Sequence, residues 1–560
     1  MKADLILLHP PSTWNFREKQ CLWGPISDVV PSTPIFEMYP MGFVSIAEYL
    51  HRFGYRVEIA NIALRMLENP KLDVERLLST FQPRLLLGID LHWLVHANGS
   101  LELAKICKKI HPNTKIVFGG LSSTYYAHEL IQEEGVDFVI KGDSTELPLL
   151  KLLQELEKSN PNFSSVPNLI YRDQTVVDNG LTYVPESLDE FTLDYKFIVN
   201  MLSSVRGIKL RFPYRGYLKN PFLAMFTVKG CTQNCLTCGG SNYFYKKYCN
   251  REAPAFRSPE RIIADLIEIE SYVKIPVFLL CDLQQGGDNY WREILDGIRR
   301  EHLDLPVVLE LFYPAPKEYY EKLSHLSEVS LQLSPETWSE EIRKHHGKSY
   351  PNSSIEKNLK HALNAGVKKF DLYFMIGLAR QTQEEFTRIL SYLEKKIIPY
   401  GDKVHFFIAP LAPFLDPGAL GFDFPEKFGY KRLFNDLKSH YKALTSYSWK
   451  DFLNYESTLT REEIAWYTYD TADKLYDIKI KYSHLSQKDY EKKKALLHQS
   501  WTIFQELEKT DKQQDVLFTE TIPALKDNLL TTDEDLYSFG NYQILSLRSF
   551  LRFIRRRLRG

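Results

Sequence analysis

The chain has 560 residues, a formal net charge of −1 at pH 7 and seven cysteines. It offers no window of the roughly 18 or more apolar residues that a membrane-spanning helix needs. Its start, MKADLILLHPP, has neither the apolar core nor the cleavage site of a secretory signal. These features argue against a disulfide-stapled secreted protein and favour a cytoplasmic chain whose cysteines bind metal or do chemistry.

The front of the chain, residues 1–155, alternates strand-like and helix-like segments. This alternation predicts an open, doubly wound α/β sheet, which binds ligands at the carboxyl ends of its strands where the strand order reverses. No GxGxxG or GxxxxGK motif is present, which argues against a nucleotide domain for hydride transfer. The predicted strand ends carry His9, Asp90, His92, Gly119, Gly120, Gly142 and Asp143.

Residues 156–221 differ in composition from the segments on either side. The stretch 158–168 is polar and loop-like, and 169–186 has the pattern of a β-hairpin that turns at Asp178, Asn179 and Gly180. We expect this segment to bridge the front domain and the next one.

Three cysteines, Cys231, Cys235 and Cys238, form a CxxxCxxC pattern in VKGCTQNCLTCGGSN, residues 228–242. Three thiols cannot all pair in disulfides, and structural zinc usually takes four protein ligands. A [4Fe-4S] cluster also usually takes four thiolates, and three would leave one iron open to a substrate or cofactor. The alternative is a chance grouping in a loop. A helix pattern after the motif, with Ser258 as its N-cap, favours a functional site.

Residues 222–417 repeat the strand–helix alternation six times. Six such units fall short of the eight of a full βα barrel. In βα barrels the chemistry lies at the carboxyl ends of the strands. Here those ends carry Asp282, Glu310, Ser334, Glu336 and the turn at 375–382.

The CxxxCxxC motif and the units that follow it resemble the radical S-adenosylmethionine (SAM) superfamily. The resemblance implies a partial six-unit barrel and a [4Fe-4S] cluster on Cys231, Cys235 and Cys238. It also implies that the open iron binds the amino and carboxylate groups of SAM. Reduction, by a donor such as flavodoxin or ferredoxin, then cleaves SAM to a 5′-deoxyadenosyl radical.

The same resemblance implies that the strand ends cradle SAM. The backbone at Gly239 and Gly240 would approach its amino group, and Arg343 would pair with its carboxylate. The remaining SAM-binding residues would be Asp282, Glu310, Ser334 and Glu336, with the two glutamates on the ribose. Ala379 and Arg380 stand where the family commonly has a proline, so that turn departs from the usual pattern.

The front domain is similar to the cobalamin-binding domain of class B radical SAM enzymes. The matching stretches are YPMGF (39–43), LLLGID (85–90), IVFGGLSST (116–124) and DFVIKGDSTE (137–146). The cobalamin-binding residues implied are Asp90, His92, Gly119, Gly120, Gly142 and Asp143. The DxHxxG motif of classical cobalamin domains is absent, as is common in this class. His92, Trp93, water or no group would then face the lower side of cobalt.

Residues 418–560 are predicted to be mostly helical and to end in a distinct tail. In 546–560, six arginines surround one apolar helical stripe, which is typical of a membrane-surface or partner-binding helix. A single terminal helix is a thin footprint for nucleic acid, which we do not expect as a partner. We expect peripheral contact with the inner face of the membrane; the alternative is a helix packed on the protein.

These features predict an α/β chain with a Rossmann-like cobalamin domain at 1–155, a linker at 156–221, a partial (βα)6 radical SAM barrel at 222–417 and a helical region at 418–560. The expected function is cobalamin-dependent radical SAM catalysis, with methyl transfer to an unactivated carbon of a small-molecule or lipid substrate. One alternative is a radical SAM enzyme that couples or cyclises carbon chains without cobalamin chemistry. Another is a non-catalytic iron–sulfur protein that binds a partner.

Overall fold

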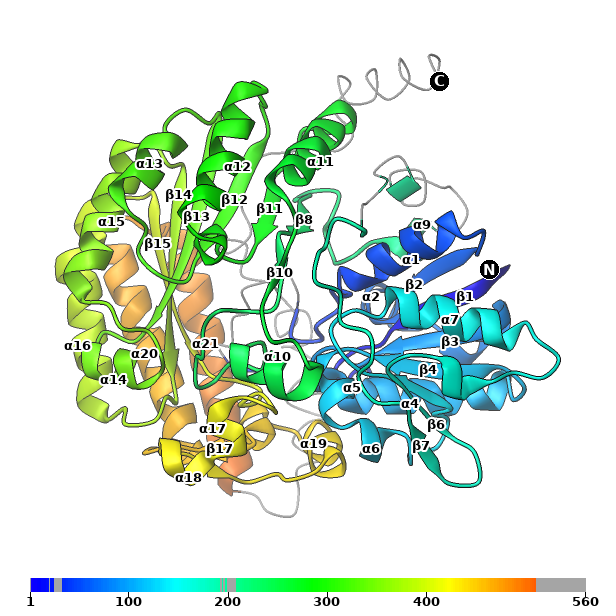
Figure 1. The fold of residues 1–560 in the computed structure, drawn as a ribbon. Helices are drawn as coiled ribbons and strands as arrows, with labels where there is room; N and C mark the ends of the chain where they lie inside the picture. The colour runs from blue at the N-terminus through cyan, green and yellow to red at the C-terminus, as the bar shows by residue number, and fades with distance from the viewer. Residues whose placement is uncertain are drawn as a thin grey trace.

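The computed structural model describes residues 2–19, 21–24, 33–191, 194, 197–198 and 208–509. Two largely parallel sheets, each flanked by helices, form the two halves of the molecule, and the last helices pack on the second sheet (Figure 1). The predicted fold class is therefore confirmed. The basic tail predicted at 546–560 lies outside the described residues.

The front sheet has seven strands in the order β2-β1-β3-β4-β5-β6-β7. Strands β1 to β5 pair in parallel, whereas β6 and β7 are antiparallel additions at one edge. The order reverses between β1 and β3, so the ligand-binding crevice of a doubly wound sheet is expected at their carboxyl ends. The strands are β1 (Lys2–His9), β2 (Val57–Asn61), β3 (Gln82–Asp90), β4 (Lys115–Gly119), β5 (Phe138–Ile140), β6 (Leu169–Arg172) and β7 (Val176–Asp178).

Helices cover both faces of this sheet. Two begin at residues whose side chains cap them, Asn61 and Asp73; Asn61 accepts a hydrogen bond from the backbone N–H of Leu64 at 2.9 Å. The helices are α1 (Gly42–Arg52), α2 (Ile62–Glu68), α3 (Val74–Ser79), η1 (Leu94–His96), α4 (Ala97–Ile110), α5 (Leu121–Tyr125), α6 (Ala127–Leu130), α7 (Glu146–Leu156), η2 (Phe163–Ser165) and α9 (Ile208–Arg211).

The predicted hairpin exists, but its turn and its place differ from the prediction. The chain reverses at 173–175, where the N–H of Asp173 donates to the carbonyl of Thr175. The Asp-Asn-Gly sequence instead ends β7. Asn179 donates to the carbonyls of Phe163 and Val166, at 2.8 and 2.7 Å, and so anchors the departing chain. The hairpin extends the front sheet rather than bridging the two halves.

The second sheet has six strands, all parallel, in the order β15-β14-β13-β12-β11-β8. Its first and last strands do not pair, so the sheet is the open six-unit barrel that was predicted. The strands are β8 (Leu223–Phe226), β11 (Val277–Leu280), β12 (Pro306–Leu311), β13 (Glu328–Glu336), β14 (Lys369–Ile376) and β15 (Val404–Pro410). A short antiparallel pair, β9 (Val228–Lys229) and β10 (Ala255–Phe256), follows β8.

The helices of the barrel follow its strands in turn. The predicted N-cap at Ser258 is confirmed, because its hydroxyl accepts a hydrogen bond from the N–H of Arg261. The helices are α10 (Asn242–Cys249), α11 (Pro259–Tyr272), η3 (Leu283–Gly286), α12 (Asp288–Arg300), α13 (Lys317–Leu323), α14 (Glu340–His345), α15 (Asn352–Asn364), α16 (Gln383–Tyr392), η4 (Leu393–Ile397) and η5 (Ile398–Tyr400).

The region after Gly418 is mainly helical and packs on the rest of the molecule. Helix α20 lies against β15 and α16, and Leu22 near the N-terminus exchanges backbone hydrogen bonds with Tyr447 and Trp449. One hydrophobic core consequently runs from the front sheet through the barrel to the last helices. The elements are α17 (Leu420–Asp423), α18 (Pro425–Phe428), β16 (Lys431–Arg432), α19 (Leu437–Ala443), η6 (Trp449–Phe452), β17 (Tyr455–Glu456), α20 (Arg461–Lys481) and α21 (Gln487–Lys509).

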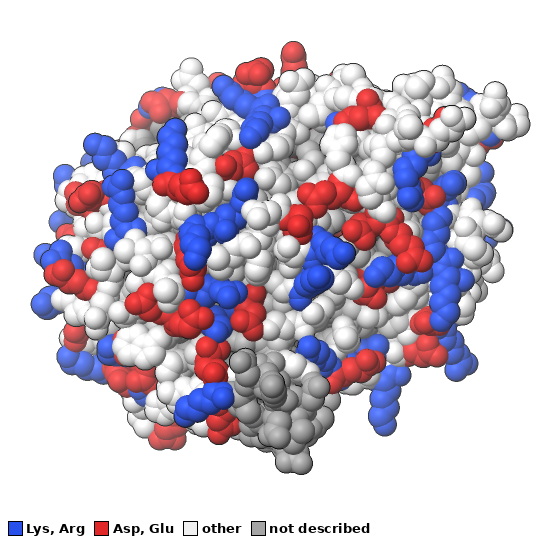
Figure 2. All heavy atoms as spheres, turned by 90° about the horizontal axis from the view of Figure 1, so that it is seen from below, with Lys and Arg blue, Asp and Glu red and all other residues white. Residues whose placement is uncertain are grey.

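Positive and negative side chains are interspersed over the face shown in Figure 2, in keeping with the net charge of −1. In the part of the chain that the structure describes, no helix combines the length and apolar character needed to span a bilayer.

Candidate functional site

The CxxxCxxC cysteines lie on the loop between β9 and α10. All seven cysteines of the chain are free thiols. Two of the three loop sulfurs accept backbone hydrogen bonds at 3.3 Å, Cys231 Sγ from the N–H of Gln233 and Cys238 Sγ from the N–H of Gly240. Such donors stabilise a thiolate and its bonds to iron.

The donor set of this loop fits an iron–sulfur cluster. Burial raises the pKa of all three thiols, that of Cys235 to about 11. Since thiolates are the metal ligands, the positive charge of iron would favour their deprotonated form. No three His, Cys, Asp or Glu side chains in the described ranges are close enough to hold one metal ion. A [4Fe-4S] cluster needs no such convergence, because each thiolate binds a different iron.

The loop after α14 supports the cluster loop. The N–H of Leu236 donates to the carbonyl of His346 at 3.2 Å. The next residue, Gly347, has φ +95°, and a Cβ there would lie 2.8 Å from the carbonyl oxygen of Asn234. Only glycine allows this approach without strain. The contact holds the cysteine loop in a fixed position relative to the strand ends of the barrel.

Two predicted carboxyl groups lie at the ends of neighbouring strands. Asp282 accepts hydrogen bonds from the N–H groups of Gln284 (2.9 Å) and Phe312 (2.7 Å), so it caps η3 and ties it to β12. Burial raises its pKa to about 6. Burial, and then repulsion by Asp282, raise the pKa of Glu310 to about 7. Asp282 is thus engaged in structural hydrogen bonds, and Glu310 is the better placed of the two to meet a ligand.

A buried lysine that sequence analysis missed completes the next strand end. Lys348 Nζ lies 2.7 Å from the Glu336 carboxylate and donates to the carbonyl of Ser334 at 2.7 Å. Burial opposes the charge of Lys348, but Glu336 and then Cys235 hold its pKa above the usual value. Glu336 has φ +68°, and its Oε2 is buried without a hydrogen-bond partner. This free oxygen suits a ligand hydroxyl.

The glycine pair after the cysteines meets a residue from the end of the barrel. The N–H of Gly239 donates to Asp416 Oδ2 at 2.9 Å, and a Cβ at Gly239 would lie 2.8 Å from the Asp416 side chain. Burial raises the pKa of Asp416 to about 6. Sequence analysis did not single out Asp416. It lies in the loop after β15, and nothing local marks it as a neighbour of the cluster.

Arg343, predicted to bind the SAM carboxylate, is buried in a different network. Its guanidinium donates to the carbonyls of Pro335, Thr337, Trp338 and Tyr350 and to the side chain of Asn352. These five hydrogen bonds hold the chain between β13 and α15 together. We therefore leave Arg343 out of the SAM-binding set proposed below.

A cavity of about 320 Å³ lies where the two halves meet. The front domain contributes the ends of β1, β3, β4 and β5, so all seven predicted strand-end residues line it. The barrel contributes Phe226, Phe278, Leu280 and Gln332, and Lys229 follows from β9. One space is thus bounded by the predicted cobalamin site and by the interior of the barrel.

Glycines shape the front wall of this cavity. Gly120 has φ +120°, and a Cβ there would lie 2.5 Å from the Cα of His92. Gly142 has φ +94°, and its N–H donates to the hydroxyl of Thr124 at 2.9 Å. These positions bring the backbone of neighbouring strands close together and leave a smooth surface on which a flat cofactor can lie.

A polar cluster lies at the point where the strand order reverses. His9 Nδ1 is 2.9 Å from Asp90 Oδ1, and the Nε2 atoms of His9 and His96 both approach the carbonyl of Phe36, at 3.0 and 2.9 Å. Asp90 Oδ2 and His96 Nδ1 are buried without partners. Burial, and then His9, lower the pKa of His96 to about 4, so it is neutral. Sequence analysis missed His96.

His92 lies on the cavity wall, as predicted. Its backbone carbonyl accepts a hydrogen bond from the N–H of Ser122 at 3.2 Å, which joins the ends of β3 and α5. Burial lowers the pKa of its imidazole, so the ring is neutral at pH 7 and has a lone pair for a metal. The adjoining Trp93 also lines the cavity and is 39% exposed.

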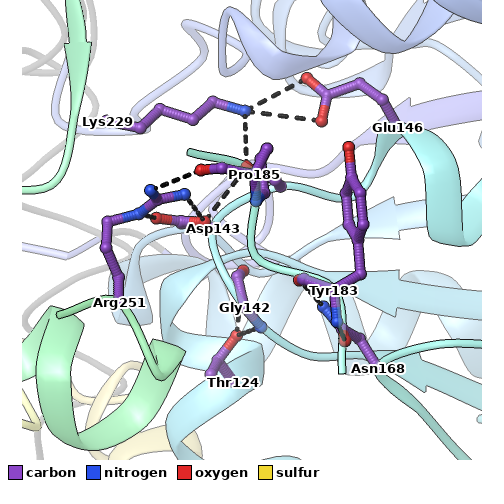
Figure 3. A network of polar contacts seen from close by, with 10 residues as sticks. Thr124, Gly142, Asp143, Glu146, Asn168, Tyr183, Pro185, Lys229 and Arg251 are labelled. Carbon is purple, nitrogen blue, oxygen red and sulfur yellow. Dashed lines mark hydrogen bonds and ion pairs between the residues drawn. The ribbon is translucent and has the colours of Figure 1, made fainter. Parts of the chain in front are cut away.

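Two ion pairs join the halves at the cavity rim (Figure 3). Arg251, just after α10, contacts both carboxylate oxygens of Asp143, one of them at 3.0 Å, and both side chains are buried. Lys229 lies 3.2 Å from Glu146. Asp143, predicted to bind cobalamin, therefore uses its carboxylate to hold the barrel. The pairs fix the crevice relative to the cluster loop.

Two family models match the chain. A B12 binding domain covers residues 28–149 and the radical SAM superfamily covers residues 225–393. The first range lies within the front domain and begins after β1, and the second lies within the barrel that carries the cysteines and ends before β15.

Two proteins with a similar fold have been solved with cobalamin bound. The chain superimposes on the radical SAM methyltransferase TsrM from Kitasatospora setae, solved with tryptophan and a SAM analogue, with a TM-score of 0.54 and 14% identity over 77% of this chain and 79% of that one. It also superimposes on the cobalamin-dependent SAM radical enzyme OxsB, solved with aqua-cobalamin and SAM, with a TM-score of 0.53 and 13% identity over 99% and 79%. At these identities the likeness shows the fold alone.

A curated relative is the anaerobic magnesium-protoporphyrin IX monomethyl ester cyclase of Synechocystis sp. (strain ATCC 27184 / PCC 6803 / Kazusa). It is 22% identical over 278 residues, which are 49% of this chain. The match spans about half, 51%, of the cyclase.

The family models, together with the thiol loop and the shared cavity, confirm the predicted cofactors: cobalamin, SAM and a [4Fe-4S] cluster. The same matches argue against the alternative of a non-catalytic iron–sulfur protein. The chain is a cobalamin-dependent enzyme of the radical SAM superfamily with an N-terminal B12-binding domain.

Proposed function

We propose that the enzyme transfers a methyl group to an unactivated carbon of a small-molecule substrate. When bound, the cluster and SAM supply the radical that activates the substrate carbon, and cobalamin supplies the methyl group. The observation that carries this proposal is a cavity that is lined by both the B12-binding sheet and the barrel. A carbon radical and its methyl donor must meet in one water-poor space, because water and solutes quench such radicals.

The chain's own residues divide the binding work. Cys231, Cys235 and Cys238 hold the cluster, with N–H donors on two of the sulfurs. At the strand ends of the barrel, Glu310 and the free oxygen of Glu336 accept hydrogen bonds from SAM hydroxyls. Gly239 and Gly240 allow the close approach of the amino group of SAM. The carbonyl of Ser334 accepts a hydrogen bond from Lys348 at the same strand end.

The crevice of the front sheet holds cobalamin. Gly119, Gly120 and Gly142 give the backbone surface against which the cofactor lies. Asp90 Oδ2 and His96 Nδ1 are both unpartnered acceptors, which matches the carboxamide N–H groups around a corrin ring. His92, whose neutral imidazole lines the crevice, would be a further side chain that holds cobalamin there.

The rival to methyl transfer is the cyclisation or coupling of carbon chains, which the magnesium-protoporphyrin cyclase relative favours. The two reactions differ in the products that they form from SAM. The protein is purified without oxygen, with cobalamin supplied, and incubated with SAM, a reductant and a small-molecule extract. Methyl transfer predicts S-adenosylhomocysteine and 5′-deoxyadenosine in equal amounts. It also predicts that the methylated product from trideuteromethyl-SAM is three mass units heavier than the same product from unlabelled SAM. Deoxyadenosine without S-adenosylhomocysteine would favour the rival.

The electron donor and the membrane contact stay predictions. A flavodoxin or ferredoxin is the reductant expected from the superfamily. The tail for which docking on an anionic membrane was expected lies outside the described residues, and its test is co-sedimentation of the full chain with anionic vesicles at low and high salt.

A further inference from the structure

A second, smaller cavity of about 90 Å³ adjoins the cofactor cavity. It lies between α1, the loop before it, the chain at 213–217 and strand β8. We call it the side chamber. The two cavities adjoin, because they share the lining residues Met38, Tyr39, Met41, Ser45, Phe222, Ala224 and Phe226.

Three of the hydroxyl groups around the side chamber, those of Tyr39, Tyr214 and Ser45, are engaged in hydrogen bonds inside the protein, whereas Tyr217 adds a fourth hydroxyl to the lining. The hydroxyl of Tyr39 donates to the carbonyl of Arg211 at 2.9 Å, and that of Tyr214 donates to the carbonyl of Asn220 at 2.6 Å. Ser45 donates to the Glu146 carboxylate at 2.8 Å. What these residues present to the chamber is ring and methylene surface.

The one charged residue in the lining is neutralised. Arg257 donates to Asp265 at 2.5 Å and to the carbonyl of Phe191 at 2.8 Å, and both members of the ion pair are buried. Its Nε–H alone lacks a partner. The rest of the wall comes from apolar side chains, among them Val44, Ile198 and Leu223. A charged or strongly polar ligand would lose its hydration here without replacement.

We propose that the side chamber binds an extended, uncharged hydrocarbon part of the substrate and so sets which carbon reaches the cofactor cavity. This inference rests on the proposed function for the identity of the ligand as substrate. The seven lining residues that the chamber shares with the cofactor cavity support it, because they place a ligand held in the chamber next to the space between crevice and barrel.

The competing occupant is the nucleotide tail of cobalamin. That tail carries a phosphate and ribose hydroxyls, for which the described side chains of the chamber offer the Nε–H of Arg257 and the hydroxyl of Tyr217 and no unpaired charge. The glycines Gly119, Gly120 and Gly142 line the crevice but not the chamber, and their backbone suits a polar tail.

The test measures binding and needs no turnover. The holoenzyme, loaded with cobalamin and cluster, is titrated with the uncharged fluorophore N-phenyl-1-naphthylamine, which is then displaced by n-alkanols from hexanol to dodecanol. Each buried methylene should strengthen displacement about fourfold until the chamber is full. Tryptophan should be at least tenfold weaker than decanol.

Val44→Trp should fill the chamber and weaken alkanol binding at least tenfold, with one cobalamin per chain retained. Val44 is half-buried on α1 and lines the side chamber but not the cofactor cavity. Leu77→Trp on α3, half-buried and outside both cavities, is the matched control and should bind as the parent does.

Two results would overturn the proposal. Cobalamin-free protein that binds the fluorophore strongly, while the holoenzyme does not, would assign the chamber to the cofactor tail. Equal alkanol affinity in Val44→Trp and the parent would place the ligand elsewhere. Neither result touches the ratio of SAM products, so failure of this inference and failure of the proposed function can be told apart.

Discussion

The two cofactor-binding edges of the molecule, one on the barrel and one on the front sheet, share an architecture but differ in charge. Both are carboxyl ends of parallel strands. The barrel edge is charged: Glu310 lies near the Glu336–Lys348 ion pair, beneath the thiol loop. The front edge offers glycine backbone at Gly120 and neutral imidazole at His96. SAM carries charges, whereas the rim of a corrin carries neutral amides, so each edge matches the ligand assigned to it.

Because the two edges differ in charge, substitutions at each should change stability and cofactor binding in different ways. At the barrel edge, removing one charge leaves another buried and unpaired, so stability and binding change together. At the front edge, the shape of the backbone matters most, so a single methyl group that forces neighbouring backbone apart can deform the cofactor-binding wall while the charges stay as they are.

The largest expected effect is loss of the thiol loop. Changing Cys231, Cys235 and Cys238 together to Ala should remove the cluster iron, about four atoms per chain, and abolish 5′-deoxyadenosine formation, while cobalamin still binds the front sheet. Iron analysis, deoxyadenosine assay and the cobalamin absorbance spectrum measure the three outcomes.

Cys107→Ala, in the core of the front domain, is the control and should keep the cluster. Deoxyadenosine formation that survives the triple change would refute the cluster assignment. Loss of cobalamin in the same variant would show that the two edges are not independent.

The next effect concerns the buried ion pair at the barrel edge. Lys348→Met leaves the Glu336 carboxylate unpaired, which should cost about 3–5 kcal/mol of stability and weaken SAM binding. Adding Glu336→Gln should restore much of the stability but not the SAM affinity, because the free oxygen of Glu336 is lost. Thermal melting and equilibrium dialysis with SAM separate the two. A double variant as unstable as the single one would mean that the ion pair is not the cause.

At the front edge, Gly120→Ala should block cobalamin. A Cβ at Gly120 would lie 2.5 Å from the Cα of His92, and φ is +120°. Gly54 also has positive φ, +84°, but open space around it. Gly54→Ala should therefore show only the strain, about 1–2 kcal/mol, and should bind cobalamin like the parent. Equal loss of cobalamin in both variants would trace the effect to strain alone.

The sequence predicted the strand ends well because the alternation of strands and helices is local. His9, Asp90, Gly120 and Glu310 are found by their position at the end of an apolar run, and the parallel sheets bring them together. The six-unit barrel followed from the same pattern. The hairpin turn was misplaced because two polar stretches compete for it, and tertiary contacts of Asn179 decide.

What the sequence could not reveal comes from loops joined only by tertiary structure. Lys348 and Asp416 reach the cluster from loops more than a hundred residues beyond it along the chain. Asp143 looked like a crevice residue until the structure placed Arg251 against it. A signal for Lys348 existed in part, because Gly347 precedes it and glycine often marks a close backbone approach.

The smallest expected effect, and the one that sharpens the comparison most, is the opposite pH dependence of the two edges in the cofactor-free protein. Glu310 has a folded pKa of about 7, above its ordinary value. The folded state binds the extra proton, so stability falls as pH rises from about 4.5 to 7. His96 has a folded pKa of about 4, below its ordinary value. The folded state excludes its proton, so stability falls as pH drops from about 6.5 to 4.

Each contribution should be on the order of 1–3 kcal/mol, measured by denaturant unfolding of the cofactor-free protein between pH 4 and 8. Glu310→Gln should flatten the loss on the alkaline side, and His96→Leu should flatten the loss on the acid side. Glu252→Gln, at a side chain that is 81% exposed, and His325→Leu, at an exposed side chain, are the matched controls and should change neither the acid nor the alkaline loss of stability. If the Glu310 and His96 variants altered the same limb, the contrast between a charged barrel edge and a neutral front edge would be wrong.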